Sequence, residues 1–409
     1  MSRSSSSWPA LPALSWAALA CGLVAACSSR DIVATSVADP DPPIPDYCQS
    51  PGPVILVGDG ITVGDSDGTA NAVCTGTVAV LTFDRALCTC EGYGTATTLD
   101  TDSFDSSLGP YASGGTEGNV GLDGGLRSNA VITIGGSLAV AGTAGVAALA
   151  DLHVAHDLDI AGPLGTGVTV RSGGDAHLAG NVDLDLLTVA GTLEIPAEAT
   201  ISGPVTAGST VRTPVTIEPP CACAASDLVD IEAFVAAHAT DNQDAVIGLT
   251  PDRLTDYHGA VTLDLPCGIY YVGPVRGDGA LTLRVTGRAA LLVDGDLSLT
   301  APFTVELDTE DAELDLMIGG LLSSNHAIVI GRADHPARTR VYVGGTGTIN
   351  LSGDSELATN FYAPRAAVAL SGAATVFGSL FVKSLEQAAP IKIHYDVNVR
   401  RADVGCPLF

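Results

Sequence analysis

The sequence predicts an all-β fold, a right-handed parallel β-helix (β-solenoid) with a short inserted α-helix and a small Cys-rich N-terminal β module. Short runs of alternating apolar and polar residues recur along the chain, each followed by Gly or Asp. Glycine is abundant, at 47 residues, whereas aromatic residues make up only 5% of the chain. Strands this short cannot build a deep sandwich, but they can stack as rungs that cover one another. Spacings that drift between about six and nine residues favour the right-handed form over a hexapeptide solenoid.

The first segment, residues 1–26, is predicted to be a lipoprotein signal peptide. A basic residue, Arg3, precedes a short apolar run, and Val24-Ala25-Ala26-Cys27 resembles a bacterial lipobox. The resemblance implies cleavage before Cys27, a lipid on its thiol and anchoring to a membrane. Ser28 resembles an outer-membrane sorting signal at this position. A plain signal peptide is the alternative, and a transmembrane anchor is disfavoured because prolines and a glycine interrupt the apolar run.

The next two segments are a Pro-rich tether at 27–47 and a Cys-rich β module at 48–110. The tether contains Asp39-Pro40-Asp41-Pro42-Pro43, a composition that excludes helix and central strand and favours an extended chain. In the module, 54–57 and 77–83 are apolar enough to be strands between Gly and Asp turns.

Cysteine usage indicates an oxidising compartment. Ten cysteines are present, and removing Cys21 with the leader and Cys27 with the lipid leaves eight. An even number in an exported chain predicts disulfides, although the spacing alone leaves 105 pairings open. A metal site is the alternative for the two C-x-C pairs, because residues i and i+2 of a strand point the same way. The predicted disulfide cysteines are Cys48, Cys74, Cys88, Cys90, Cys221, Cys223, Cys267 and Cys406.

Two β-solenoid segments, 111–218 and 260–409, are predicted to flank an insert at 219–259. The insert begins with Pro219-Pro220-Cys221-Ala222-Cys223 and continues into a helix expected from Ser226 or Asp227 to His238. The helix is predicted because apolar residues recur at helical spacing on one face, where they would pack against the solenoid. These residues are Leu228, Ile231, Phe234, Val235 and His238.

Composition excludes some partners. The net charge is −28, so nucleic acid and anionic surfaces would be repelled. Because the acids are scattered along the chain, the charge is typical of a solvated surface. No phosphate loop, dinucleotide fingerprint or nucleophile elbow occurs at a strand-to-helix junction, and no cofactor is expected.

Two stretches near the end carry a family resemblance. One is Asn360-Phe361-Tyr362-Ala363-Pro364-Arg365-Ala366, and the other is Gly378-Ser379-Leu380-Phe381-Val382-Lys383-Ser384-Leu385 followed by Ile393-His394-Tyr395-Asp396. Over roughly the last 190 residues the chain resembles an uncharacterised family of exported bacterial β-solenoid proteins, among them lipoproteins and pilus-associated proteins. The resemblance implies fold and location and no activity. A looser likeness is to bactofilins, which form polymers.

Candidate chemistry is sparse. Asp294 and Asp296, or Asp308 and Asp311, are acid pairs of the type that polysaccharide lyases and hydrolases use as acid and base. They also fit loop acids between strands. On the outer face, His153, Asp157 and His177 could meet on adjacent rungs and bind a metal, although their placement as solvent-facing strand residues is favoured. The last strand is expected to point Tyr395 inward and both His394 and Asp396 toward solvent.

The sequence therefore predicts a lipid-anchored outer-membrane protein without enzymatic activity, acting in envelope structure, adhesion or docking. Its expected partners are the membrane, through the lipid, and envelope proteins, glycans or further copies of itself. The alternative is a polysaccharide-acting β-helix enzyme at the outer membrane.

Overall fold

The structure is a computed structural model that describes residues 48, 83–148, 150–165, 168–225 and 227–401. The signal peptide, the whole tether with Cys27, and residues 49–82 with Cys74 and the strands predicted at 54–57 and, except for Phe83, at 77–83 lie outside the described residues, as do Ser226 and Cys406. Within the described part, no helix is long and apolar enough to cross a membrane.

The described chain forms a parallel β-helix in which three strands make one turn. Strands β4, β5 and β6 pair in parallel with β7, β8 and β9, so each strand lies on the strand one turn earlier. Burial alternates along many of the strands: in β6, Ile132 and Ile134 are buried and Thr133 is exposed. The inward aliphatic residues of successive turns stack on one another, as Leu138 does on Leu158, and form one continuous core. The predicted all-β parallel β-helix is confirmed.

The strands of the first half are β1 (Leu87–Thr89), β2 (Tyr93–Thr95), β3 (Leu99–Phe104), β4 (Val120–Leu122), β5 (Leu126–Ser128), β6 (Ile132–Ile134), β7 (Leu138–Val140), β8 (Val146–Ala148), β9 (Leu152–Val154), β10 (Leu158–Ile160), β11 (Leu164–Gly165), β12 (Thr169–Ser172), β13 (Ala176–Leu178), β14 (Val182–Asp183), β15 (Leu186–Ile195), β16 (Ile201–Ser202) and β17 (Val205–Arg212). Those of the second half are β18 (Val261–Leu265), β19 (Gly268–Val272), β20 (Val275–Gly277), β21 (Leu281–Val285), β22 (Arg288–Val293), β23 (Leu297–Leu299), β24 (Phe303–Leu307), β25 (Glu313–Ile318), β26 (Leu322–Ser324), β27 (Ile328–Ile330), β28 (Thr339–Val343), β29 (Thr348–Leu351), β30 (Ser355–Leu370), β31 (Ala374–Gln387) and β32 (Ile391–Asp396). Short 3₁₀ turns are η2 (Ser106–Leu108), η3 (Pro336–Arg338) and η4 (Val397–Arg401).

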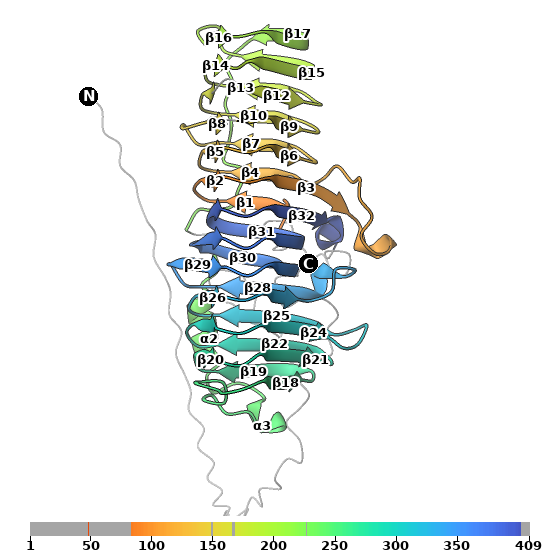
Figure 1. Ribbon diagram of the computed structural model, residues 1–409, viewed down its shortest axis with the longest axis vertical. Helices are drawn as coiled ribbons and strands as arrows, with labels where there is room; N and C mark the ends of the chain where they lie inside the picture. Colours follow the sequence, from red (N-terminus) through yellow and green to blue (C-terminus); the bar gives the residue numbers. More distant parts are fainter. Residues whose placement is uncertain (1–47, 49–82, 149, 166–167, 226, 402–409) are drawn as a thin grey trace, which may run out of the picture. The chain divides into compact units, whose positions relative to one another are not determined.

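The chain enters this stack in the middle. Strands β1 and β2 pair on one side with β4 and β5 and on the other side with β31, and β3 pairs with both β6 and β32. Figure 1 shows the orange strands β1 and β3 directly beside the blue strands β31 and β32. From β1 the turns proceed to β17 at one end, the chain returns to the opposite end, and the turns from β18 lead back to the middle. The parallel pairing of β1–β3 with β31 and β32 is hereafter the seam.

The seam corrects the predicted domain division. Residues 48–110 were expected to form a separate Cys-rich module, but strands β1, β2 and β3 are rungs of the β-helix itself. The repeat was hidden because an excursion of the chain follows β3. Leu87 pairs with Val120, whereas Val120 pairs with Leu138 at a spacing typical of the later turns.

Side-chain carboxylates and amides hold successive turns together at the corners. The Oδ1 atom of Asp157 accepts a hydrogen bond from the backbone N–H of Asp175, and Asp175 accepts one from Thr192. Asn119 accepts in the same way from Ser137. Each acceptor satisfies a backbone donor that the turn leaves outside the strand ladder. The frequent Asp and Asn residues at strand ends therefore have a structural role.

The insert contains two helices, α2 (Ile231–Ala237) and α3 (Asp244–Ile247). The predicted helix is present but begins later than expected, because Asp227 closes a turn through its N–H to Ala224. Asp230 caps α2 by accepting a hydrogen bond from the N–H of Ala233. Ile231, Phe234 and Val235 are buried, as the helical spacing predicts.

The two ends of the stack are closed differently. Beside β19, the backbone N–H of Gln243 donates to Ile269, and the carboxylate of Asp244 accepts from Tyr271. At the other end, Thr210 and Arg212 of β17 lie over the inward residues Leu193 and Ile195. The guanidinium of Arg212 donates to the carbonyl oxygens of Pro196 and Ala199. Thr210 and Arg212 thus put polar side chains at two of the inward positions of the final turn.

Candidate functional site

One outward column of side chains changes character along the stack. Strand register aligns one residue from each turn on this column. In spatial order the residues are Leu292, Met317, Tyr342, Tyr362, Phe381, Cys88, Gly121, Ala139, Asp159, His177 and Glu194. The column is apolar or aromatic over the second half, small from the seam to Ala139 and charged from Asp159 to Glu194, and the exposed Val211 follows Glu194 on the final turn.

The segment that leads from the end of β17 to the start of β18, residues 213–260, covers the apolar part of the column; we call this segment the return. Helix α2 contacts β25, and the N–H of Val229 donates to the hydroxyl of Tyr362 at 3.0 Å. Phe83 meets the ring of Tyr362 edge-on, and Tyr362 stacks on Phe381 with ring centroids 5.4 Å apart. These outward residues are buried because the return covers them.

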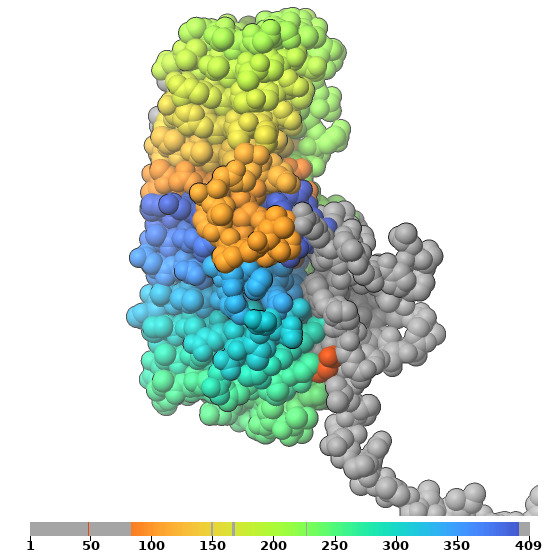
Figure 2. All heavy atoms as spheres, turned by 90° about the vertical axis from the view of Figure 1, so that its right-hand side faces the viewer, coloured from red at the N-terminus to blue at the C-terminus, as the bar shows by residue number. Residues whose placement is uncertain are grey.

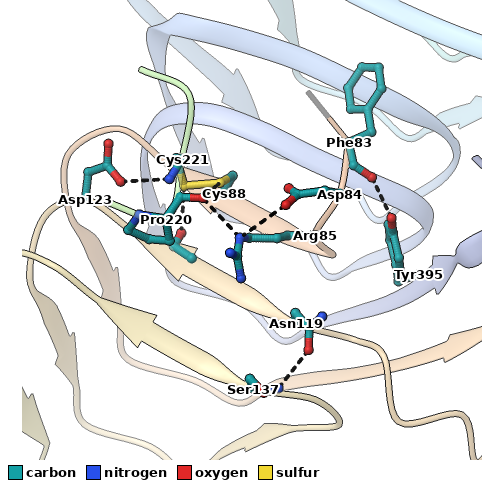
Figure 3. A network of polar contacts seen from close by, with 11 residues as sticks. Phe83, Asp84, Arg85, Cys88, Asn119, Asp123, Ser137, Pro220, Cys221 and Tyr395 are labelled. Carbon is teal, nitrogen blue, oxygen red and sulfur yellow. Dashed lines mark hydrogen bonds and ion pairs between the residues drawn. A yellow bond between two sulfur atoms is a disulfide. The ribbon is translucent and has the colours of Figure 1, made fainter. Parts of the chain in front are cut away.

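Near the seam the return lies directly on the strands. Disulfides join Cys88 to Cys221 and Cys90 to Cys223, and Arg85 donates from Nε to the carbonyl oxygen of Pro220 at 3.1 Å. The N–H of Cys221 donates to Asp123 (Figure 3). A third disulfide joins Cys48 to Cys267. The predicted disulfides are therefore present for the six described cysteines, and the C-x-C pairs do not bind metal.

The small residues of the column permit this close approach. A Cβ atom on Gly121 would lie 2.8 Å from Cδ of Arg85 and 3.0 Å from Cβ of Pro220. Any larger side chain would push the return away from the sheet.

Beyond Gly121 the return lifts off the sheet. We call residues 213–220 the strap; Figure 1 shows this return as a thin trace running alongside the strands of the first half. The N-terminal end of the strap is held by the N–H of Thr213, which donates to the carbonyl oxygen of Ile195. Its C-terminal end is held by Arg85, which donates to the carbonyl oxygen of Pro220, and by the adjoining disulfide at Cys221. Between the two ends lies a groove of about 590 Å³. The sheet side of the groove is lined by Ala139, Asp159, His177 and Glu194.

The charged groups of the groove are arranged around one imidazole. Nδ1 of His177 lies 2.6 Å from Oδ1 of Asp159, and Glu194 follows on the next turn. Partial burial would lower the pKa of His177, but the hydrogen bond and charge of Asp159, with the charges of Glu194 and Asp175, raise it above its ordinary value. The groove thus holds a hydrogen-bonded histidine–carboxylate pair beside a further carboxylate.

The structure does not assemble the metal site considered for His153, Asp157 and His177. The carboxylate of Asp157 accepts a hydrogen bond from the backbone N–H of Asp175 on the next turn. Nδ1 of His153 lies 3.4 Å from a guanidinium nitrogen of Arg171. No group of His, Cys, Asp and Glu residues among the described ones has the geometry to hold a metal ion. Asp159 is the carboxylate that sequence reasoning missed, although strand alternation places it outward, one turn before His177.

The candidate catalytic acids have structural partners. Oδ2 of Asp294 accepts a hydrogen bond from the hydroxyl of Tyr271 at 2.6 Å, and Oδ1 of Asp296 accepts from the N–H of Leu321 at 2.9 Å. Burial, followed by that hydrogen bond, raises the pKa of Tyr271 to about 12. Asp294 and Asp296 therefore belong to the corner contacts that join successive turns.

The expectation for the last strand was half wrong. Tyr395 points inward as predicted, but Asp396 is 1% exposed and the side chain of His394 only 13% exposed. The excursion at 105–118 covers both; it forms the orange knob on the face shown in Figure 2. Asp102 accepts from the hydroxyl of Tyr111 at 2.6 Å and lies 2.7 Å from Nδ1 of His394, whose ring packs on Tyr111.

Comparison with known proteins adds a domain family over the second half. Residues 223–402 match the family model of a domain of unknown function (DUF7305). The match spans the stretch from the disulfide-bonded Cys223 to η4. None of the curated proteins matches the chain.

A structural comparison finds the crystal structure of an ice binding protein from an Antarctic bacterium, Flavobacteriaceae. The two chains share 14% sequence identity with a TM-score of 0.18, and the match covers 82% of this chain and 100% of that one. At this TM-score the fold assignment rests on the strand pairing described above.

Proposed function

We propose that the protein is a lipid-anchored, non-enzymatic β-solenoid of the bacterial cell envelope that docks a partner through the groove beneath the strap. The observation that carries the docking role is the strap itself. It is fixed at both ends and stands over charged side chains, whereas the remainder of the return packs on apolar ones. A surface built in this way is a binding site that is formed before its ligand arrives.

The three disulfides support the location. They join segments as far as 219 residues apart, and such bonds persist in exported proteins rather than in the reducing cytosol. Together with the lipobox-like Val24–Cys27, they favour the envelope over the cytoplasm.

Metabolic labelling with an alkyne fatty acid tests the anchor. We expect label on the wild-type chain in the outer-membrane fraction, and none on Cys27→Ser. A wild-type chain that is exported without label would show that the anchor is absent.

A site-specific photo-crosslinker tests docking in cells. Placed at Thr216 of the strap, it should yield a discrete adduct, whereas at the exposed Val329 on β27 it should not. Equal adducts at both positions would contradict a docking role for the groove.

The alternative is a polysaccharide-acting enzyme, but its candidate acids Asp294 and Asp296 are engaged in contacts between turns. A direct assay tests this alternative. The purified chain is incubated with a panel of envelope glycans, and cleavage that is lost in Asp294→Asn or Asp296→Asn would overturn the non-enzymatic reading.

A further inference from the structure

We propose that the groove beneath the strap binds an extended peptide segment carrying lysine or arginine side chains. The proposal rests on the docking function above and names the chemistry of the partner. Three features of the groove point to it: two carboxylates that make no hydrogen bond or salt bridge with the described residues, the backbone of the strap and the fixed ends of the strap.

The first feature is charge. Asp159 is already engaged by His177, whose Nδ1 lies 2.6 Å from Oδ1 of Asp159. Glu194 on the sheet side and Glu218 on the strap both line the groove, and neither forms a hydrogen bond or ion pair with the described residues. Arg85, the other cation of the groove, lies at its lower end and is held by Pro220 and Asp84. An ammonium or guanidinium group entering the groove would therefore find two carboxylates that no hydrogen bond or salt bridge of the described residues engages, in a protein whose net charge of −28 attracts cations from a distance.

The second feature is the backbone of the strap. Residues 215–218 belong to no helix or strand, and their backbone N–H and C=O groups make no hydrogen bond within the described part of the protein. An extended peptide lying in the groove alongside the strap would pair with these groups, in the manner of strand addition to a sheet edge. A small ion or a sugar would leave them unused.

The third feature is preorganisation. Thr213 is held at one end and Cys221 at the other, so the strap need not be ordered when a partner binds. The groove volume of about 590 Å³ lies within the range of small-ligand sites, roughly 300 to 1,000 Å³. It is large enough for a short stretch of peptide and too small for a folded domain.

The test measures peptide binding by the disulfide-bonded mature chain carrying Cys27→Ser, which keeps it free of lipid. The probe is a short, end-capped peptide of alternating lysine and threonine, with a glutamine–threonine peptide as the uncharged comparison. Titration calorimetry follows binding to the wild-type groove and to a chain with Glu194→Gln and Glu218→Gln. The matched control is Glu306→Gln with Glu356→Gln, which removes the same charge from exposed positions on β24 and β30. Thr216→Pro removes one strap N–H without a change of charge.

We expect saturable binding of the lysine peptide and none of the glutamine peptide. The groove variant should weaken binding by about tenfold, the control variant by less than about twofold, and Thr216→Pro should weaken it with all charges in place. Circular dichroism and melting curves show that each variant is folded.

Three results would overturn the proposal: no saturable binding by the wild-type chain, equal weakening in groove and control variants, or unchanged binding by Thr216→Pro. The first two would show at most a diffuse electrostatic attraction. A failure of the peptide proposal can be distinguished from a failure of the proposed function, because lipid labelling and the crosslink at Thr216 do not depend on a cationic partner.

Discussion

The buried carboxylate of Asp396 accepts two hydrogen bonds from Ser106, one from its backbone N–H at 3.0 Å and one from its hydroxyl at 2.7 Å. Asp396 ends the last strand of the second half, and Ser106 follows β3 of the first half. Burial raises the pKa of Asp396, and the bonds from Ser106 oppose that rise. The contact therefore joins the two halves of the chain at the seam.

Ser106→Ala should lower the free energy of unfolding by about 1–3 kcal/mol, because it leaves a buried carboxylate oxygen without its donor. Urea denaturation followed by circular dichroism measures the change. Ser107→Ala, at an exposed neighbour, should change it by less than about 0.5 kcal/mol. Equal effects of the two substitutions would show that the seam does not depend on this contact.

Mild reduction should open the disulfides in an order set by burial. Cys88 and Cys221 are 2% and 8% exposed, whereas Cys48, Cys90, Cys223 and Cys267 are half-buried. We expect Cys90–Cys223 and Cys48–Cys267 to react before Cys88–Cys221, because a thiolate must reach the sulfur it attacks. Alkylation with peptide mapping at increasing reductant measures the order. Simultaneous opening of all three would mean that the fold unfolds before any of them reacts.

His177 should titrate above its ordinary pKa of 6.5, and Asp159→Asn should bring its pKa down. The folded state then binds the proton more tightly than the unfolded state. The resulting stabilisation is complete below the ordinary pKa and is lost as the pH rises through the folded one. Imidazole NMR resonances measure both values. A His177 pKa unchanged by Asp159→Asn would contradict the pairing.

Arg340 and Asp315 form a buried bidentate ion pair, with Nε to Oδ1 at 2.6 Å and Nη2 to Oδ2 at 3.1 Å. Arg340→Met should cost about 3–5 kcal/mol because it leaves the carboxylate of Asp315 buried without its counter-ion. Adding Asp315→Leu should recover much of the loss, since the uncompensated charge is then gone. A double-mutant cycle in urea measures the coupling. Additive losses would show that the two side chains act independently.

Thr210 and Arg212 should keep the β17 end from associating with further copies. Replacing both by Val removes the polar core positions and the contacts of Arg212 with Pro196 and Ala199, and leaves an apolar edge. Sedimentation velocity should show a monomeric wild-type chain and concentration-dependent association of the variant. Arg171→Val, on an outward position of β12, is the control. A wild-type chain that assembles over the same range would instead support end-to-end polymerisation.

Local pattern predicted the rungs, because alternation such as that of Ile132–Ile134 reports directly which side chains face the core. It could not predict the seam, since the pairing of Leu87 with Leu380 joins strands far apart in sequence. The same limit explains the wrong placement of Asp396, whose cover comes from an excursion with no strand pattern of its own. Spacing also could not pair the cysteines, although each C-x-C pair proved to lie opposite the other.

The groove beneath the strap could be predicted from the sequence only in part. Alternation placed His177 outward, and it placed Asp159 outward as well, but the pair becomes visible only when turns of unequal length are aligned. The strap could not be expected from the chain, because nothing in residues 213–220 indicates which face they cross.

The mid-stack entry of the chain has a consequence for how such proteins can diversify. Whole turns can be gained or lost near β17 or near β18 without altering the seam, because both sites are remote from the pairing of β1–β3 with β31 and β32. Gains near β17 would lengthen the distance that the strap must span and so enlarge the groove, whereas gains near β18 would leave it unchanged. Relatives of different length should therefore differ in the reach of their binding surface according to which end has grown.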